Sequence, residues 1–124
     1  YGLSYTSFSL TKPGLTVKRI TGNQPVKCTV VLTNTGEMKG SEVVQLYVRE
    51  DNPTVLRPVK ELKRFDKIAL FPGEKRIVEF ELTRQDFAFW DEQSHDWKVN
   101  PGQYTIMLGT SSKAIEHSLS FAIE

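Results

Sequence analysis

Hydrophobic and polar residues alternate along most of the chain, with a period of two residues. In residues 41–50, for example, Val44, Leu46 and Val48 fall on one face of an extended segment. No segment shows a sustained apolar period of 3.6 residues, the period of an amphipathic helix. The alternation predicts strands over residues 5–11, 25–34, 41–50, 61–70, 74–83, 103–109 and 115–123. We therefore expect an all-β protein of seven or eight strands.

Turn-forming residues separate these segments. Pro72-Gly73 and Pro101-Gly102 each precede a strand, with proline setting φ and glycine accepting a positive φ. Residues 51–58 contain two prolines and are expected to form a loop, and residues 84–89 are expected to form a short helical turn. Such punctuation is typical of antiparallel strands that fold back on one another.

Within residues 61–70 the alternation slips between Leu62, Phe65 and Ile68, which predicts a β-bulge. The number and spacing of the strands favour a single domain, an immunoglobulin-like or fibronectin type III-like antiparallel β-sandwich over residues 1–124. A small barrel is the alternative. Cys28 is the single cysteine, so the Cys…Trp…Cys pattern of true immunoglobulin domains is missing and the fibronectin-like relatives fit better. Cys28 shares its face with apolar neighbours and is expected to be a small buried hydrophobe.

The charge of the chain is nearly balanced, with 16 Lys and Arg against 15 Asp and Glu. This balance argues against nucleic acid or an anionic membrane as a partner. No apolar run approaches the roughly 20 residues of a membrane-spanning helix. No metal-ligand spacing or phosphate-binding loop occurs, so we expect no cofactor and no metal.

The segment from Trp90 to Trp97 holds the densest group of chemically active side chains. Asp91 and Glu92 could serve as the paired carboxylates of sugar hydrolysis, and His95 with the acids could hold a metal. Adjacent carboxylates on an extended chain point to opposite faces, however, which makes a poor catalytic pair. We therefore favour a polar hairpin loop between strands that carry the two tryptophans.

Trp90 and Trp97 also suggest a second possibility. Exposed aromatic rings stack on sugar faces, so the two rings on facing strand ends could form a sugar-binding platform. The alternative is that they close the end of the core or pack against a neighbouring domain.

Several motifs, in order along the chain, resemble a known family. They are Tyr1-Gly2-Leu3-Ser4-Tyr5-Thr6, Val43-Val44-Gln45-Leu46-Tyr47-Val48, Arg57-Pro58-Val59-Lys60-Glu61-Leu62, Leu70-Phe71-Pro72-Gly73-Glu74, Phe87-Ala88-Phe89-Trp90-Asp91 and Pro101-Gly102-Gln103-Tyr104. Together they resemble the C-terminal fibronectin type III-like domain of glycoside hydrolase family 3 enzymes, over essentially the whole chain. One departure is Arg64, where the family often has glycine before the phenylalanine.

The resemblance implies a context for the chain. Family members are mostly retaining, exo-acting enzymes such as β-glucosidases, which hydrolyse terminal β-linked sugars with catalytic residues on two other domains. No residue here matches those catalytic motifs, so the resemblance implies a non-catalytic structural module that packs on the preceding catalytic domains. It also implies a periplasmic or secreted location. A carbohydrate-binding module and an independent enzyme are the alternatives.

The same resemblance suggests which residues make the interdomain contact. Residues 1–4 would be the end of a linker, so Tyr1, Leu3 and Tyr5 are expected to contact the preceding domain. Arg57 and Lys60 are added because a loop beside a strand end could reach a neighbour's carboxylates.

Overall fold

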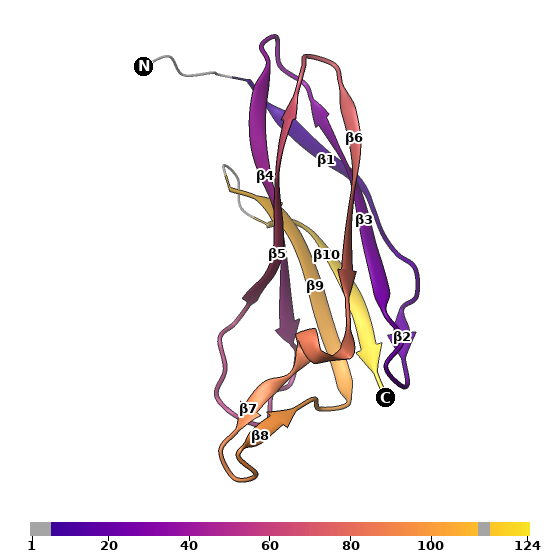
Figure 1. The fold of residues 1–124 in the computed structure, drawn as a ribbon, viewed down its shortest axis with the longest axis vertical. Coiled ribbons are helices and arrows are strands. Elements are labelled where there is room, and N and C mark those ends of the chain that lie inside the picture. Colours follow the sequence, from indigo (N-terminus) through magenta and orange to yellow (C-terminus); the bar gives the residue numbers. More distant parts are fainter. Residues whose placement is uncertain (1–5, 112–114) are drawn as a thin grey trace.

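The computed structural model describes residues 6–111 and 115–124 and consists of two packed β-sheets and a separate two-stranded hairpin (Figure 1). The smaller sheet has the strand order β1-β3-β6, and the larger has the order β2-β10-β9-β4-β5. The elements are β1 (Phe8–Leu15), β2 (Arg19–Ile20), β3 (Val26–Asn34), β4 (Gly40–Glu50), β5 (Glu61–Leu70), β6 (Lys75–Leu82), a 3-10 helix (Arg84–Phe87), β7 (Phe89–Asp91), β8 (Asp96–Lys98), β9 (Gly102–Thr110) and β10 (Ile115–Ile123). The predicted β-sandwich is confirmed.

The seven long strands correspond to the seven segments of alternating residues, and the short helix lies where a helical turn was expected. The sequence pattern did not predict β2, which pairs with β10 in parallel, whereas the other pairings are antiparallel. It also ended the first strand too early. β1 continues to Leu15 through an irregularity between Thr11 and Gly14, where Lys12 has a φ of 55°. Pro13 lies in this irregularity because it has no N–H to contribute to the ladder.

The predicted bulge in β5 is present. Leu46 of β4 pairs with Arg64, and the next residue, Tyr47, pairs with Leu62, so Lys63 is the extra residue. The bulge changes which side chains face the core. Ile68 is buried in the core, whereas Leu62 and Phe65 are exposed. Two large apolar side chains therefore lie on the outer surface of the sandwich.

The turn before β6 has the backbone conformation that Pro72-Gly73 predicts. Gly73 has a φ of 80°, and the N–H of Glu74 donates a hydrogen bond of 3.0 Å to the carbonyl of Phe71. Proline followed by a glycine of positive φ is the sequence of a type II turn. Gly102 at the start of β9 also has a positive φ, of 137°.

The core lies between the two sheets and is closed at one end by the 3-10 helix. Val44, Leu46 and Val48 are buried in it, as their shared face predicted. Phe87 of the helix is fully buried, with its ring centroid 5.2 Å from those of both Tyr104 and Phe121. This aromatic cluster connects the core to the loops at the lower end of Figure 1.

Cys28 is fully buried in β3, which confirms the prediction from its sequence position. Burial raises the pKa of the thiol to about 11, so almost no reactive thiolate exists near neutral pH. We expect a thiol reagent at pH 8 to leave the folded chain unmodified and to modify Cys28 once denaturant is added. Spectrophotometric thiol counting in both conditions tests this, and rapid stoichiometric modification of the folded chain would contradict it.

Candidate interaction site at the loop end of the sandwich

Loop 51–60, which joins β4 to β5, lies beside the β7–β8 hairpin at the lower end of Figure 1. A groove of about 770 Å³ separates the two. Its lining includes Leu56, Arg57, Phe89, Trp90, Trp97 and Lys98. Apolar and charged side chains therefore share this surface.

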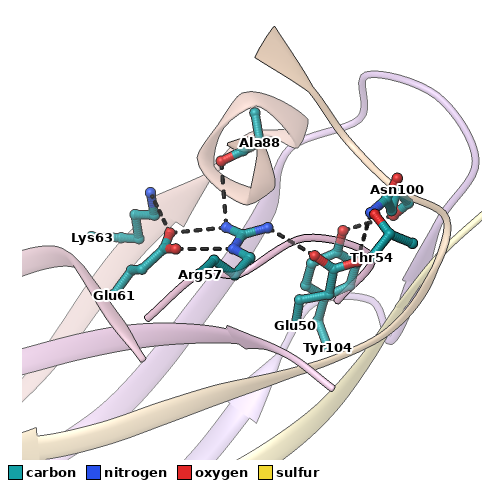
Figure 2. A network of polar contacts seen from close by, with 8 residues as sticks. All are labelled: Glu50, Thr54, Arg57, Glu61, Lys63, Ala88, Asn100 and Tyr104. Carbon is teal, nitrogen blue, oxygen red and sulfur yellow. Dashed lines mark hydrogen bonds and ion pairs between the residues drawn. The ribbon is translucent and has the colours of Figure 1, made fainter. Parts of the chain in front are cut away.

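A buried arginine organises the loop from within, as Figure 2 shows. The side chain of Arg57 is only 5% exposed and lies between two carboxylates. Its Nη1 donates a hydrogen bond of 2.9 Å to Oε1 of Glu50. Its Nε and Nη2 donate to the two carboxylate oxygens of Glu61, at 3.0 and 2.9 Å. This two-pronged geometry is the strong form of an arginine–carboxylate pair.

The same network extends to the irregular segment between β8 and β9 (Figure 2). The side-chain amide of Asn100 donates to Oε2 of Glu50 at 3.0 Å and to the Thr54 hydroxyl at 2.9 Å. The Tyr104 hydroxyl donates to the backbone carbonyl of Asn100 at 2.7 Å. Every buried side-chain nitrogen or oxygen in the described part of the chain has a partner. The network therefore connects loop 51–60 to β4, β5 and β9.

The ion pair with Arg57 outweighs the cost of burial for Glu61. Burial by itself raises the pKa of Glu61, but the hydrogen bonds and charge of Arg57 lower it, and the net effect is a lowered pKa. Burial correspondingly lowers the pKa of Arg57, while Glu61 and Glu50 raise it, and the net effect is a raised pKa. Arg57 and Glu61 are therefore both charged at neutral pH.

The structure assigns different surroundings to the residues expected at an interdomain contact. Arg57 points inward and uses its charge on carboxylates of its own chain. Lys60 is exposed, with its Nζ 4.8 Å from the centre of the Tyr47 ring. Tyr1, Leu3 and Tyr5 lie outside the described residues. The interdomain contact itself stays a prediction.

The two tryptophans come together as the sequence pattern predicted. Trp90 of β7 and Trp97 of β8 are directly opposite each other, on the antiparallel hairpin expected for this segment. Their ring centroids are 5.6 Å apart, with the ring planes inclined at 77°. This edge-to-face arrangement is a favourable aromatic pair. It differs from a coplanar platform, and sugar stacking on the two rings stays a prediction.

Asp91 of the hairpin accepts hydrogen bonds within its own turn. Asp91 accepts hydrogen bonds from the Ser94 hydroxyl at 2.8 Å and from the Gln93 N–H at 3.4 Å. The Ser94 hydrogen bond is the main reason that the pKa of Asp91 lies below its ordinary value. A lowered pKa keeps the carboxyl group ionised, which is the opposite of what a general acid needs. His95 has a φ of 53° and lies at the turn itself.

No group of three or more His, Cys, Asp and Glu side chains in residues 6–111 and 115–124 is arranged to hold a metal ion. No helix in these same ranges has the length and apolar character needed to span a membrane.

The sequence did not reveal which residues of this end are exposed and apolar, or which one is a buried carboxylate. Leu56 and Val59 are strongly exposed apolar residues in a loop that has no regular periodicity to reveal them. The burial of Glu50, in contrast, could have been predicted from the sequence. It continues the buried face of Val44, Leu46 and Val48, and a carboxylate on a core face needs a buried partner.

The buried hydroxyl of Tyr104 should make the free energy of unfolding fall at alkaline pH. Burial first, and then the nearby charge of Glu50, raise the pKa of Tyr104 to about 12 from an ordinary value of 10.0. The folded chain therefore keeps this proton between pH 10 and 12, where the unfolded chain loses it. We expect the free energy of unfolding to fall by roughly 2–3 kcal/mol across that range. Denaturant unfolding at several pH values measures the loss.

Absorbance at 295 nm follows the ionisation of tyrosine and tests whether Tyr104 causes that pH dependence. The folded wild-type chain should show a tyrosine titration step near pH 12, and Tyr104→Phe should remove this step. A step near pH 12 that persists in Tyr104→Phe would contradict the assignment.

Comparison with known proteins identifies the domain. The family model described as "Fibronectin type III-like domain" matches residues 42–112. "Thermostable beta-glucosidase B" of Acetivibrio thermocellus is 41% identical over 115 residues, covering 93% of this chain and 15% of that protein. "Beta-glucosidase BoGH3A" of Bacteroides ovatus is 35% identical over 121 residues, covering 98% of this chain and 16% of that protein.

Solved structures agree with these relatives. The GH3 β-glucosidase of Bifidobacterium adolescentis matches with a TM-score of 0.87 and 36% identity, over 99% of this chain and 18% of that chain. A β-glucosidase of Listeria innocua in complex with isofagomine matches with a TM-score of 0.87 and 34% identity, over 99% of this chain and 17% of that chain. The chain thus spans less than a fifth of the length of these relatives. It belongs to the fibronectin type III-like domain family, in the form found as a small C-terminal part of glycoside hydrolase family 3 β-glucosidases.

Proposed function

We propose that the chain is the non-catalytic, stabilising module of a larger β-glucosidase-like enzyme, which hydrolyses terminal β-linked sugars. The observation that carries the proposal is the small share of each relative that this chain covers. Nearly all of this chain matches about one sixth of each of two β-glucosidases, which leaves most of each relative outside the match. The module would stabilise the catalytic part by packing on it, as domains of one polypeptide commonly do.

The use of charge within the domain supports a structural role. Glu50 and Glu61 are engaged by Arg57, and Asp91 is engaged by its own turn. Paired carboxylates for glycoside hydrolysis need one group with a raised pKa as the acid. Both Glu61 and Asp91 instead have lowered pKa values, so neither is suited to donate a proton near neutral pH.

Deletion from the longer enzyme tests the proposal. Removing residues 6–124 should lower the thermal midpoint of the remaining part and reduce the yield of soluble enzyme. Full activity on an aryl β-glucoside at an unchanged midpoint would contradict a stabilising role.

The purified chain provides the matching test for catalysis. It should release no product from an aryl β-glucoside. Turnover that disappears in an Asp91→Ala/Glu92→Ala double variant would show that the chain is itself an enzyme and would overturn the proposal.

A further inference from the structure

Exposed apolar side chains are concentrated on three segments that start at the loop end of the sandwich. Of the eleven large hydrophobic residues that are exposed in the described part of the chain, seven lie on loop 51–60, β5 and the β7–β8 hairpin. These seven, here called the docking face, are Val55, Leu56, Val59, Leu62, Phe65, Trp90 and Trp97. Four of them, Val55, Leu56, Trp90 and Trp97, line the groove. Single exposed hydrophobes are ordinary, but a group of this kind at a groove marks an interaction site.

The most exposed member lies next to the most firmly held residue of the loop. Leu56 is completely exposed, whereas the side chain of its neighbour Arg57 is 5% exposed and paired with Glu50 and Glu61. Arg57 also donates to the carbonyl of Ala88 at 3.4 Å and lies 5.6 Å from the Phe89 ring, so it connects the loop to the start of the hairpin. The buried network thereby holds both walls of the groove in place before any partner arrives.

A loop ordered in this way loses little conformational entropy on binding, because its backbone is already held. A fully exposed leucine on an ordered loop gains apolar burial only when another surface covers it. The geometry therefore points to Arg57 as the residue that positions Leu56 and Val59 for contact.

The charges at the edge of the docking face indicate the character of the partner surface. Lys60 and Lys67 flank the apolar residues of β5, and neither makes an ion pair with another described residue. Asp66, Glu92 and Asp96 are also exposed on these segments. A complementary surface would therefore have an apolar centre for the leucine and aromatic side chains, and charges of both signs at its edge.

We propose that the docking face binds the remainder of the same polypeptide, an inference that rests on the proposed function. Relatives carry this domain attached to a much longer chain. A tethered partner is present at a high effective concentration, which favours it over a free second copy. The tryptophan rings are inclined at 77° and do not form a coplanar platform for a sugar, which favours protein as the occupant.

The test uses the longer enzyme and replaces exposed residues that the core does not need. The Leu56→Asp/Val59→Asp double variant should lower the thermal midpoint of the whole enzyme. It should also accelerate amide hydrogen exchange in loop 51–60 at least tenfold. Ile77→Asp is the matched control, because Ile77 is an equally large, exposed apolar residue on β6, outside the docking face. It should leave both measurements near wild type.

Three outcomes distinguish failure of the docking face from failure of the stabilising role. If deletion of residues 6–124 lowers the midpoint but the double variant behaves like Ile77→Asp, the docking face is wrong while the stabilising role holds. If neither change has an effect, both fail. If the double variant instead shifts a monomer–dimer equilibrium in sedimentation, or abolishes a response of Trp fluorescence to cello-oligosaccharides, the occupant is a second copy or a glycan, and the proposal is overturned.

A double-mutant cycle tests the role of Arg57 as a positioning residue. In the longer enzyme, Arg57→Met should accelerate exchange in loop 51–60 as Leu56→Asp does, and combining the two should add little further acceleration. Fully additive effects would show that Arg57 contributes only general stability and does not act through Leu56.

Discussion

Replacing Arg57 with methionine is expected to lower the free energy of unfolding of the chain by about 3–5 kcal/mol, because removing one partner of a buried ion pair leaves the other uncompensated. Here two carboxylates lose their partner. Glu50 is as buried as Arg57, with 5% of its side chain exposed, and Glu61 is 20% exposed. Urea unfolding at pH 7, followed by circular dichroism, measures the change.

The pH dependence of this loss identifies its cause. In the wild-type chain the lowered pKa of Glu61 stabilises the fold above its unfolded pKa, and this contribution is lost as the pH falls through the lower folded value. Without Arg57 the hydrogen bonds and charge that lower the pKa of Glu61 are gone, so Glu61 gains its proton at higher pH. The difference between Arg57→Met and wild type should therefore shrink as the pH falls from 7 toward 4.

Lys60→Met is the matched control for Arg57→Met, since it removes an exposed cation from the same loop. A change within about 0.5 kcal/mol is expected for such a surface substitution. Equal stability of Arg57→Met and Lys60→Met would mean that the carboxylates turn into water when the arginine is removed, and that the network does not hold the loop.

The second large effect is expected in the aromatic cluster at the end of the core that the 3-10 helix closes. Phe87→Ala should lower the free energy of unfolding by about 3–5 kcal/mol, the usual cost of truncating a buried phenylalanine. The ring is fully buried, packs edge to face with Tyr104 and stacks on Phe121. Truncation leaves a cavity at the point where the 3-10 helix closes the sandwich, and denaturant unfolding measures the cost.

Phe65→Ala is the matched control for Phe87→Ala, because it removes the same side-chain atoms from an exposed position. Phe65 is 65% exposed on β5, so its truncation should change the free energy of unfolding by no more than about 0.5 kcal/mol in the isolated chain. A loss below 1 kcal/mol for Phe87→Ala would indicate that the helix collapses into the space, and would contradict a rigid aromatic cluster.

Much of the fold follows from the sequence because its causes are local. Alternation of side chains along a strand determines which residues enter the core, so Val44, Leu46 and Val48 were correctly assigned. The slip in β5 predicted the bulge at Lys63, and Pro72-Gly73 predicted its turn. These features depend on a few neighbouring residues and on the backbone preferences of proline and glycine. β2 escaped prediction because a two-residue strand carries no periodicity.

The sequence by itself determined the strands, the turns and the buried face of each strand, and its ordered motifs indicated the family. Only the tertiary structure decided which side chains of loop 51–60 are buried and which are exposed. Arg57 appeared available to a neighbour, yet it is held by Glu50 and Glu61 of its own chain. Glu50 lies at the end of β4 and Asn100 lies before β9, so the network forms only when distant segments meet. A loop without periodicity leaves side-chain directions open until such contacts settle them, which is why Leu56 emerged as exposed only in three dimensions.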